Sequence, residues 1–350
     1  MTVRVVLGWV WIAAHGVGCA SGIETPSGFV FEGGTMGTTY LVRVVPGGRA
    51  IVNEAALAVE IKDALDDVEA RMSHYRPDSE VSRFNQARHT EPIELSAPTF
   101  EVFAEAHAIG VTSGGALDIT VGPLVNAWGF GPEEPVSLPP AAAVIGNLLE
   151  ATGLDRLELD PRTSAVRKTV PELEVDLSAV AKGYAVDRVA EMVAARGHDR
   201  FMVEVGGEVA ARGTNLRGVP WRIAIERPTV EGGIQDVLSL ERGAMATSGD
   251  YRNVREVDGR LLSHTIDPRT GYPVNHRLTS VTVVAGSCLE ADGLATALEV
   301  LGPDAGYALA VDLDLAVLFL VRGDDGTITA RSTDRFEALT AGSNSASALE

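Results

Sequence analysis

The sequence predicts an α+β protein, with mixed, largely antiparallel sheets and helices arranged in two lobes of one domain. Short strand patterns are interleaved with helical patterns, without the steady alternation of strand and helix found in a parallel nucleotide-binding sheet. The chain has 350 residues, of which 45% are hydrophobic and 22% charged, so it can bury the core of one large domain or two small ones. A folded globular protein is therefore expected.

The elements follow from hydrophobic spacing. In residues 55–72 the apolar side chains recur every three or four residues and the acidic ones lie largely on the other side, which indicates an amphipathic helix. A glycine-rich turn at 33–38 leads into a strand. Residues 132–140 are the best candidate linker. In chain order we expect strand 40–45, helices 55–72, 98–111 and 140–152, strand 156–160, helix 181–196, strands 201–205, 221–226 and 279–285, helices 290–301 and 303–311, and strand 316–321.

The chain begins like an exported protein. Residues 5–14 are apolar, follow Arg4 and precede small residues, which is typical of a secretory signal, whereas a membrane span needs about twenty apolar residues. Cys19 stands where a bacterial lipoprotein carries its lipidated cysteine, although Gly16 occupies the position where Leu or Val is usual. We expect lipidation of Cys19, with ordinary cleavage after Ala20 as the alternative.

This start predicts the location and the limits of the chain's parts. We expect an exported protein held at the cell membrane by a lipid anchor, periplasmic or on the outer face of the cytoplasmic membrane. Residues 1–19 would be the signal peptide with the lipobox cysteine, residues 20–339 the folded domain, and residues 340–350 a disordered tail. With Cys19 acylated, only Cys288 remains, so no internal disulfide can form.

The net charge excludes one class of function. The formal charge is −19 and there is no run of Lys or Arg, so the chain is not expected to bind a nucleic-acid backbone, which needs clustered cations. An anionic ligand would need a local pocket of positive charge or a metal ion. The chain also has no P-loop, no H-E-x-x-H, no C-x-x-C and no G-x-S-x-G motif.

Asp292 and Thr296 are four residues apart on an otherwise apolar predicted helix. Side chains at this spacing lie on one helical face, so a carboxylate and a hydroxyl would point to the same place. Two hard oxygen donors suit Mg²⁺ better than Zn²⁺. The alternative is structural: Thr296 bonds back to its own helix, and Asp292 lies in the first turn, where the helix dipole favours a negative charge.

Several loops, taken together, resemble a known family. In chain order they are TMGTTY at 35–40, MSHYRPDSEVSRFN at 72–85, ALDITVGPLVNAWGFG at 116–131, DLSAVAKGYAVD at 176–187, VGGE at 205–208, TSGDY at 247–251, HTIDPRTGYP at 264–273 and ADGLATA at 291–297. With these blocks, from about residue 35 to about residue 321, the chain resembles the ApbE-type flavin transferases, which move FMN from FAD onto a protein. The predicted domain is then an ApbE-like catalytic domain with FAD between its lobes.

The resemblance implies the binding residues. A Mg²⁺ ion would hold the FAD pyrophosphate through the Ala179 carbonyl, the Asp292 carboxylate and the Thr296 hydroxyl, with the Ala295 carbonyl as a further candidate. Mg²⁺ keeps few protein ligands and completes its shell with water and phosphate oxygens. The implied FAD contacts are Met36, Tyr75, Ala116, Leu117, Asp118, Asp176, Lys182 and Ile266.

Each of these residues also has an ordinary structural interpretation. Tyr75 could be a half-buried tyrosine after a helix rather than a ring that stacks on the ligand. Asp118 and Asp176 could be a loop cap and a helix cap rather than acceptors for ligand hydrogen bonds. Lys182 could be a solvated surface lysine rather than a point charge for phosphate. The coincidence of the blocks favours the functional interpretation.

The implied reaction is attack by a Thr or Ser hydroxyl of an acceptor flavoprotein on the FMN-side phosphorus of FAD. It would release AMP and leave FMN attached through a phosphodiester. His264 is the candidate base because an imidazole titrates near neutrality and this one shares a loop with Ile266. Asp267 could orient it or act itself. In the family the acceptor is typically a subunit of a membrane redox complex.

Two other functions use the same residues. A Mg²⁺-dependent FAD pyrophosphatase would use water in place of the hydroxyl and yield FMN and AMP. A noncatalytic exported FAD-binding protein would store or present the flavin, although binding alone needs no base. A purely structural lipoprotein would leave the loop blocks unexplained.

Overall fold

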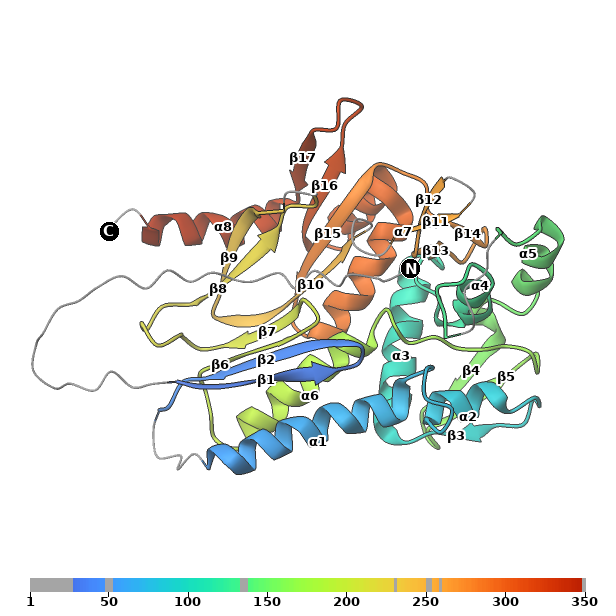
Figure 1. The fold of residues 1–350 in the computed structure, drawn as a ribbon, viewed down its shortest axis with the longest axis horizontal. Helices are drawn as coiled ribbons and strands as arrows, with labels where there is room; N and C mark the ends of the chain where they lie inside the picture. Colours follow the sequence, from blue (N-terminus) through green and yellow to red (C-terminus); the bar gives the residue numbers. More distant parts are fainter. Residues whose placement is uncertain are drawn as a thin grey trace, which may run out of the picture.

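The fold is built on one long antiparallel sheet. The computed structural model describes residues 28–47, 53–132, 138–229, 232–249, 254–257 and 260–347 (Figure 1). The strand order is β1-β2-β6-β7-β10-β15-β16-β17, and every described neighbour pairs antiparallel. Its strands are β1 Phe29–Thr35, β2 Thr38–Val44, β6 Phe201–Val205, β7 Glu208–Arg212, β10 Arg242–Gly249, β15 Leu278–Ala285, β16 Ala316–Arg322 and β17 Ile328–Ser332.

Four helices cover one face of this sheet. They are α1 Glu54–Met72, α3 Ala97–Thr112, α6 Ala181–Ala195 and α7 Cys288–Asp312, and Figure 1 shows α6 and α7 against the middle strands. Strand alternation explains the packing, because Phe201, Val203 and Val205 of β6 are buried in the core cluster under the helices while Met202 and Glu204 point the other way. The main core therefore lies between the sheet and these helices.

The opposite face is covered in part. A two-stranded sheet, β8 Trp221–Glu226 and β9 Ile234–Leu240, and helix α8 Asp334–Ser347 lie over it. Trp221, Ile223 and Ile225 alternate with exposed residues along β8 and are buried in a second apolar cluster, together with Phe336 of α8. This layer closes the face of the sheet over β7, β10 and β16.

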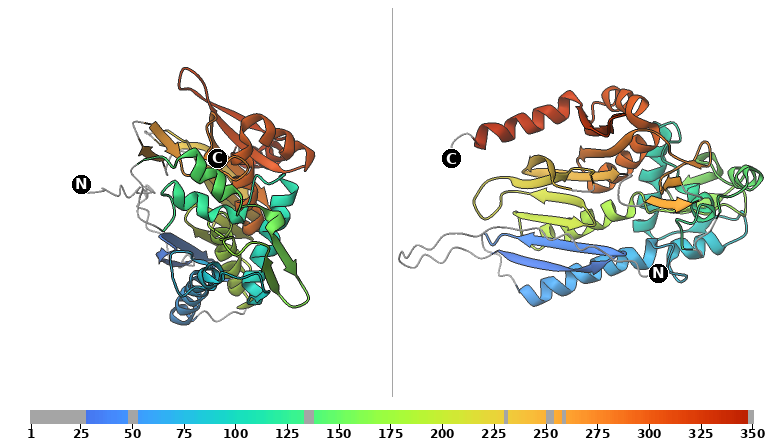
Figure 2. Two further views of the ribbon diagram at one scale, coloured as in Figure 1. Left: turned by 90° about the vertical axis from the view of Figure 1, so that its right-hand side faces the viewer. Right: turned by 45° about the horizontal axis from the view of Figure 1, so that its top comes forward.

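The remaining elements form a smaller second lobe at one end of the sheet (Figure 2). It contains the three-stranded sheet β3-β5-β4, two small hairpins and several short helices. The bounds are α2 Glu80–Gln86, β3 Ile93–Glu94, η1 Ile119–Val121, α4 Gly122–Ala127, α5 Ala142–Leu149, η2 Leu154–Arg156, β4 Leu157–Asp160, β5 Ala165–Lys168, β11 Val254–Val257, β12 Arg260–Ser263, β13 Ile266–Asp267 and β14 Tyr272–Pro273. The α+β class with mixed, largely antiparallel sheets is confirmed.

Helix α7 is the largest departure from the expected elements. The predicted helices 290–301 and 303–311 are the two halves of one element, interrupted at Gly302, whose φ is 79°, and followed by Pro303. The helix begins at Cys288 with Ser287 as its N-cap, so Asp292 lies in the second turn and not in the first as the sequence suggested.

At the other end of the chain, helix α8 continues to Ser347, into the segment for which we predicted a disordered tail. Cys19 and the predicted signal lie outside the described residues. Within the residues that the structure describes, no helix is long and apolar enough to span a membrane.

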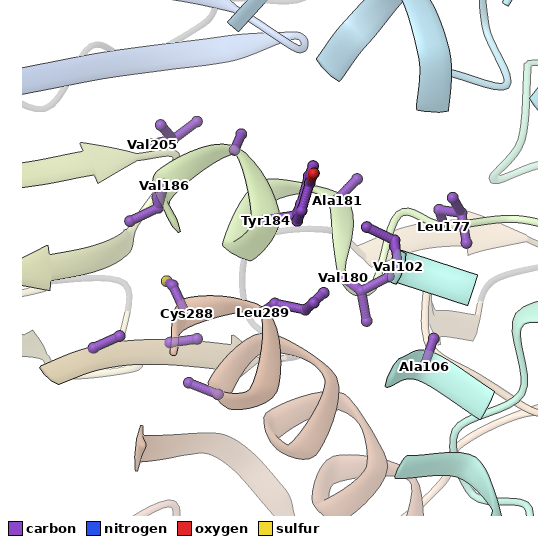
Figure 3. Close-up of a cluster of buried hydrophobic side chains, with 14 of the residues drawn as sticks. Val102, Ala106, Leu177, Val180, Ala181, Tyr184, Val186, Val205, Cys288 and Leu289 are labelled. Atoms are coloured by element: carbon purple, nitrogen blue, oxygen red, sulfur yellow. The ribbon is translucent and has the colours of Figure 1, made fainter. Parts of the chain in front are cut away.

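Helices α6 and α7 cap each other at their N-termini. The Asp187 carboxylate of α6 accepts hydrogen bonds from the backbone N–H groups of Cys288 and Leu289, both at 2.8 Å. The Asp292 carboxylate of α7 accepts one from the backbone N–H of Gly183 at 2.9 Å. Free N–H groups at a helix start favour such carboxylates. Figure 3 shows the start of α7, with Cys288 and Leu289, lying beside α6.

This contact is possible because residue 183 is a glycine. A Cβ at Gly183 would lie 2.3 Å from the Cys288 carbonyl oxygen and 2.8 Å from the Cβ of Asp292. Both distances are far below van der Waals contact, so no side chain fits between the helices. The absence of a side chain thus sets the distance between α6 and the carboxylate of Asp292.

We predict that Gly183→Ala lowers the free energy of unfolding by about 3 kcal/mol, because the new methyl group must push α7 away and weaken both caps. Urea denaturation followed by circular dichroism measures this change. The matched control is Gly146→Ala in α5, where a Cβ meets nothing within 4 Å, and helix propensity should leave that variant unchanged or more stable by up to about 1 kcal/mol. Equal stability of the two variants would contradict the proposed constraint.

Candidate functional site

One large cavity lies between the main sheet with its helices and the second lobe. Its volume is about 830 Å³, which is large enough for a dinucleotide-sized ligand. Eleven of the predicted site residues line it, and they come from both lobes. These are Tyr75, Ala116, Leu117, Asp118, Asp176, Ala179, Lys182, His264, Ile266, Asp292 and Thr296.

At the sheet side of the cavity, one lysine lies between two buried carboxylates. Lys182 Nζ is 2.7 Å from Glu208 Oε1 and 3.8 Å from Asp292 Oδ1. Glu208 and Asp292 are each only 3% exposed, whereas 31% of the Lys182 side chain is accessible. Lys182 is therefore paired, and is not the solvated surface lysine of the alternative interpretation, but it still presents charge to the cavity.

Burial dominates the ionisation of this cluster. It raises the pKa of Glu208 to about 7, with the nearby Asp292 raising it further and Lys182 opposing both. Burial also raises the pKa of Asp292, against the effects of Lys182 and the Gly183 N–H. Burial alone would lower the pKa of Lys182, but the two carboxylates raise it well above its usual range. The lysine therefore stays charged at neutral pH.

Glu208 is the most important residue that the sequence analysis did not assign. Its Oε2 is buried and has no hydrogen-bond partner, which is costly for a carboxylate oxygen. It follows a two-residue turn between β6 and β7 at Gly206 and Gly207, whose φ values of 64° and 109° both favour glycine. The block VGGE at 205–208 contains Glu208 and was part of the family resemblance. The block itself did not indicate that the glutamate would pair with Lys182.

Thr296 joins this cluster from one turn further along α7. It lines the cavity with Asp292, as the i, i+4 spacing predicted, and its hydroxyl is 3.2 Å from the hydroxyl of Ser248 on β10. Ser248 was not assigned from the sequence either. The structure thus brings two hydroxyls and two carboxylates to one wall of the cavity.

This wall has the donors that Mg²⁺ prefers. Asp292, Thr296 and Ala179 line the cavity, and the unpartnered Oε2 of Glu208 adds negative charge nearby. Hard oxygen donors in small number suit Mg²⁺, which keeps several waters. Among the described residues there is no group of three or more His, Cys, Asp or Glu side chains that could hold a metal. Ala295 is fully buried and does not line the cavity.

The second lobe supplies an apolar and aromatic end to the cavity. Ala116 and Leu117 are buried there, and Ile266 lies opposite in β13. Tyr75 is 61% exposed, donates a weak hydrogen bond of 3.4 Å to the Phe130 carbonyl, and packs against His74 with ring centroids 4.3 Å apart. An exposed ring at the edge of a cavity is suited to stacking on an aromatic ligand.

Asp118 and Asp176 are both buried and both cap local turns. Asp118 Oδ1 accepts hydrogen bonds from the backbone N–H and the hydroxyl of Thr120, at 2.8 and 2.6 Å. Asp176 Oδ1 accepts the corresponding pair from Ser178 and lies 3.2 Å from His74 Nδ1. Burial raises the pKa of Asp118 despite these bonds. Asp118 is therefore the N-cap of η1, as its alternative interpretation predicted. Asp176 caps only the turn at Ser178 and is not the predicted helix cap, because the N-cap of α6 is Val180. In each aspartate the Oδ2 atom makes none of these bonds.

The remaining predicted residues lie as follows. His264 is half-buried at the cavity, with its ring edge-on to Phe130 at 6.5 Å. Asp267 does not line the cavity, because its carboxylate binds the Arg269 guanidinium at 2.8 Å and caps the turn that follows. Met36 does not line it either; it forms the β1–β2 turn with a φ of 48°, unusual for a residue with a side chain. Met36, Asp267 and Ala295 are thus the predicted site residues that do not line the cavity, although Ala295 precedes Thr296 directly in α7.

The fold and cavity define a class of protein: an α+β protein with one large site between its lobes, lined by apolar and aromatic residues and by a charged, oxygen-rich wall. Comparison with known proteins narrows this class. The sequence model of the ApbE family matches residues 36–319. The chain belongs to the ApbE family.

Its relatives match along most of their length. The FAD:protein FMN transferase of Vibrio cholerae is 46% identical over 310 residues, which cover 87% of this chain and 91% of the relative. That of Haemophilus influenzae is 44% identical over 314 residues, covering 88% and 90%. The solved structure of the flavin transferase ApbE from Vibrio cholerae superposes with a TM-score of 0.82 at 42% identity, covering 89% of this chain and 99% of that one. The ApbE protein of Thermotoga maritima gives a TM-score of 0.79 at 29% identity, covering 89% and 99%.

We predict that Lys182→Met destabilises the fold more at pH 8 than at pH 5. Without the ammonium, the folded-state pKa values of Glu208 and Asp292 rise further above their unfolded values. The loss of folding free energy is therefore small at a pH where both carboxyl groups are protonated in the folded state. It grows as the pH rises through neutrality, because ionising these groups then opposes folding. Leaving two buried charges unpaired should cost about 3 kcal/mol or more at pH 8. Urea denaturation at the two pH values measures it.

Lys62→Met is the control for Lys182→Met. Lys62 pairs with Asp66 on the surface of α1, with side chains 48% and 50% exposed. Removing such a pair should change stability by less than about 0.5 kcal/mol at either pH. A loss for Lys182→Met that does not depend on pH would show that the two carboxylates are not coupled to the lysine.

Proposed function

We propose that this chain transfers FMN from FAD to an acceptor protein, using the cavity between its lobes. The observation that carries the proposal is the wall made by Lys182, Asp292, Glu208 and the hydroxyls of Thr296 and Ser248, in a chain of the ApbE family. Relatives named FAD:protein FMN transferase, 40% to 46% identical over most of the chain, support the same activity.

FAD would lie along the cavity with its two ends in different surroundings. The ring system would pack among Ala116, Leu117, Ile266 and the exposed face of Tyr75, because these residues form the apolar end. The pyrophosphate would lie against the opposite wall, where Lys182 provides a fixed positive charge. In a chain of net charge −19, the Lys182 ammonium would supply part of the counter-charge that a dianionic group needs, and a bound metal ion would supply the rest.

The donor set fits Mg²⁺, held by Asp292, Thr296 and the Ala179 carbonyl. Bound there, Mg²⁺ would neutralise phosphate charge and stabilise the transition state of phosphoryl transfer. The chain's own contribution is to hold the ligands in place: Gly183 fixes the Asp292 carboxylate through its N–H, and Ser248 contacts the Thr296 hydroxyl. Both donors therefore approach the cavity with limited freedom.

The reaction is a displacement at the FMN-side phosphorus. The hydroxyl oxygen of a Ser or Thr on the acceptor forms a bond to this phosphorus, and the bond from phosphorus to the oxygen of AMP breaks. FMN becomes attached through a phosphodiester, AMP leaves, and the hydroxyl proton passes to a base. His264 lines the cavity, and imidazole is the side chain best suited to accept a proton in general base catalysis, so we assign it this role. Asp267 is held by Arg269 and is the weaker candidate.

The location of the protein forms part of the proposal. A secretory start with Cys19 in a lipobox-like position supports export and attachment to the cell membrane, periplasmic or on the outer face of the cytoplasmic membrane. The acceptor would then be a flavoprotein subunit of a membrane redox complex with an exposed Ser or Thr segment. Mass spectrometry of the protein extracted from cell membranes should find a lipid on Cys19; an unmodified N-terminus at residue 21 would instead indicate ordinary cleavage.

The decisive experiment incubates residues 20–350 with FAD, Mg²⁺ and a purified acceptor flavoprotein domain. We expect release of AMP together with a gain on the acceptor equal to the mass of FMN less one water. AMP without that gain would indicate FAD hydrolysis, and bound FAD without AMP a storage protein. Asp292→Asn should fold, because the amide oxygen can still accept from Gly183, but should lose at least about a hundredfold in rate.

A second prediction separates binding from proton transfer at His264. His264→Ala should bind FAD with a Kd within about threefold of wild type, because the residue touches only one part of a long cavity, while kcat for transfer falls by about a hundredfold. Fluorescence titration gives the Kd, and AMP release gives kcat. A rise in Kd that accounts for the whole loss in kcat/KM would make His264 a binding residue.

A further inference from the structure

Strand β8 has one paired edge and one open edge. It pairs antiparallel with β9, from Trp221 opposite Leu240 onward, and in the described part of the chain no other strand pairs with it. The short bridge between Thr214 and Pro220 covers only the approach to the strand. A row of backbone donors and acceptors on such an edge is a template for another strand.

The direction of the backbone groups follows from the residue after the strand. The Arg227 N–H donates a hydrogen bond of 2.9 Å to the carbonyl of Gly233, which precedes β9, so the backbone of Arg227 faces β9. Backbone groups alternate sides along a strand, so those of Arg222 and Ala224, an odd number of residues away, face the open side. Both side chains are exposed, and neither residue's N–H or carbonyl takes part in a described hydrogen bond beyond the β8–β9 ladder.

The surface beside this edge is half apolar. Beneath it the main sheet continues into β6, where Met202 and Glu204 point toward the β8 layer and are only half-buried. At the start of β8, Leu216 and Val219 are 52% and 44% exposed. An extended segment beside β8 would bury these apolar groups.

The open edge ends at the cavity. Ala224 and Ile225 line the cavity, as do Ser248 and Glu208 on the wall proposed to hold the pyrophosphate. The six residues of β8 span about 20 Å, so a segment paired along them would run from Leu216 and Val219 to the site of transfer. A strand paired along this edge would therefore have one end at the cavity.

We propose that β8 is the docking strand for the acceptor: an extended segment of about six residues adds to the open edge and presents its Ser or Thr hydroxyl at the cavity end. The inference rests on the proposed function, because only a transferase needs to receive a protein segment here. Backbone pairing supplies affinity with little dependence on sequence, and an apolar residue at the far end of the segment packs on Leu216 and Val219.

The test compares Arg222→Pro with Arg222→Ala in the transfer assay. Arg222 is exposed and does not line the cavity. Proline removes the N–H on the open side and places its ring there, yet breaks no bond to β9, so the strand is expected to fold. We expect KM for the acceptor to rise at least about tenfold in Arg222→Pro, with kcat and the Kd for FAD within about twofold of wild type. Arg222→Ala removes the same side-chain charge but keeps the N–H, and should behave as wild type.

Hydrogen exchange of the unaltered protein provides a second measurement that needs no variant. Binding of the acceptor should slow exchange at the amides of Arg222 and Ala224. The proposal is overturned if exchange there is unchanged at saturating acceptor, or if Arg222→Pro keeps the wild-type KM. Failure of wild type to label any acceptor would instead overturn the proposed function, so the two failures are distinguishable. Protection that appears without acceptor and rises with protein concentration would indicate pairing of two copies of this chain and would also overturn the proposal.

Discussion

The site depends on the contact in which α6 and α7 exchange carboxylate caps. Asp187 reaches from α6 to the first N–H groups of α7, and Asp292 reaches back from α7 to the N–H of Gly183. Because all three hydrogen bonds are between 2.8 and 2.9 Å, the helices cannot slide relative to one another without losing them. Burial raises the pKa of Asp187 to about 6 even though it accepts two N–H groups, so this carboxylate is held in a dry interface. One consequence is that Asp292 has a structural task as well as the proposed metal-binding one.

The electrostatics of the cavity follow from this contact. With Asp292 fixed, Lys182 on the first turn of α6 is placed between it and Glu208, which arrives from the β6–β7 turn. Three ionisable groups with a net charge of about −1 are thereby buried together. Placing two buried carboxylates beside one ammonium is costly, and the proposed Mg²⁺ would offset part of that cost by binding Asp292. The proposal of a metal-bound phosphate at this wall rests on this cluster.

The charged wall of the cavity and the open edge of β8 come from different layers of the molecule. The wall is made at the helix-covered face of the sheet, where α6 and α7 meet β7 and β10, whereas β8 belongs to the layer on the opposite face. They meet only because the ends of β7, β8 and β10 reach the same cavity. This arrangement would let a protein segment approach from one side while FAD enters between the lobes.

Many of the helices and strands could be predicted from the sequence, because hydrophobic periodicity and residue spacing are local properties that do not depend on tertiary contacts. Helix 55–72, the strands 201–205 and 221–226, the break between 301 and 303, and the shared face of Asp292 and Thr296 are properties of short segments. The roles of Glu208 and Ser248, the capping by Asp187 and the open edge of β8 could not be predicted, because each depends on elements far apart in the chain. Asp267 shows the opposite error, a residue that the sequence suggested as catalytic but that does not line the cavity. Its carboxylate instead binds Arg269 in the turn that follows.

The sequence by itself determined many of the elements, the family and which residue types could do the chemistry. Only tertiary packing decided which of them share a cavity, because burial and distance set both the pKa of a carboxylate and what it can reach.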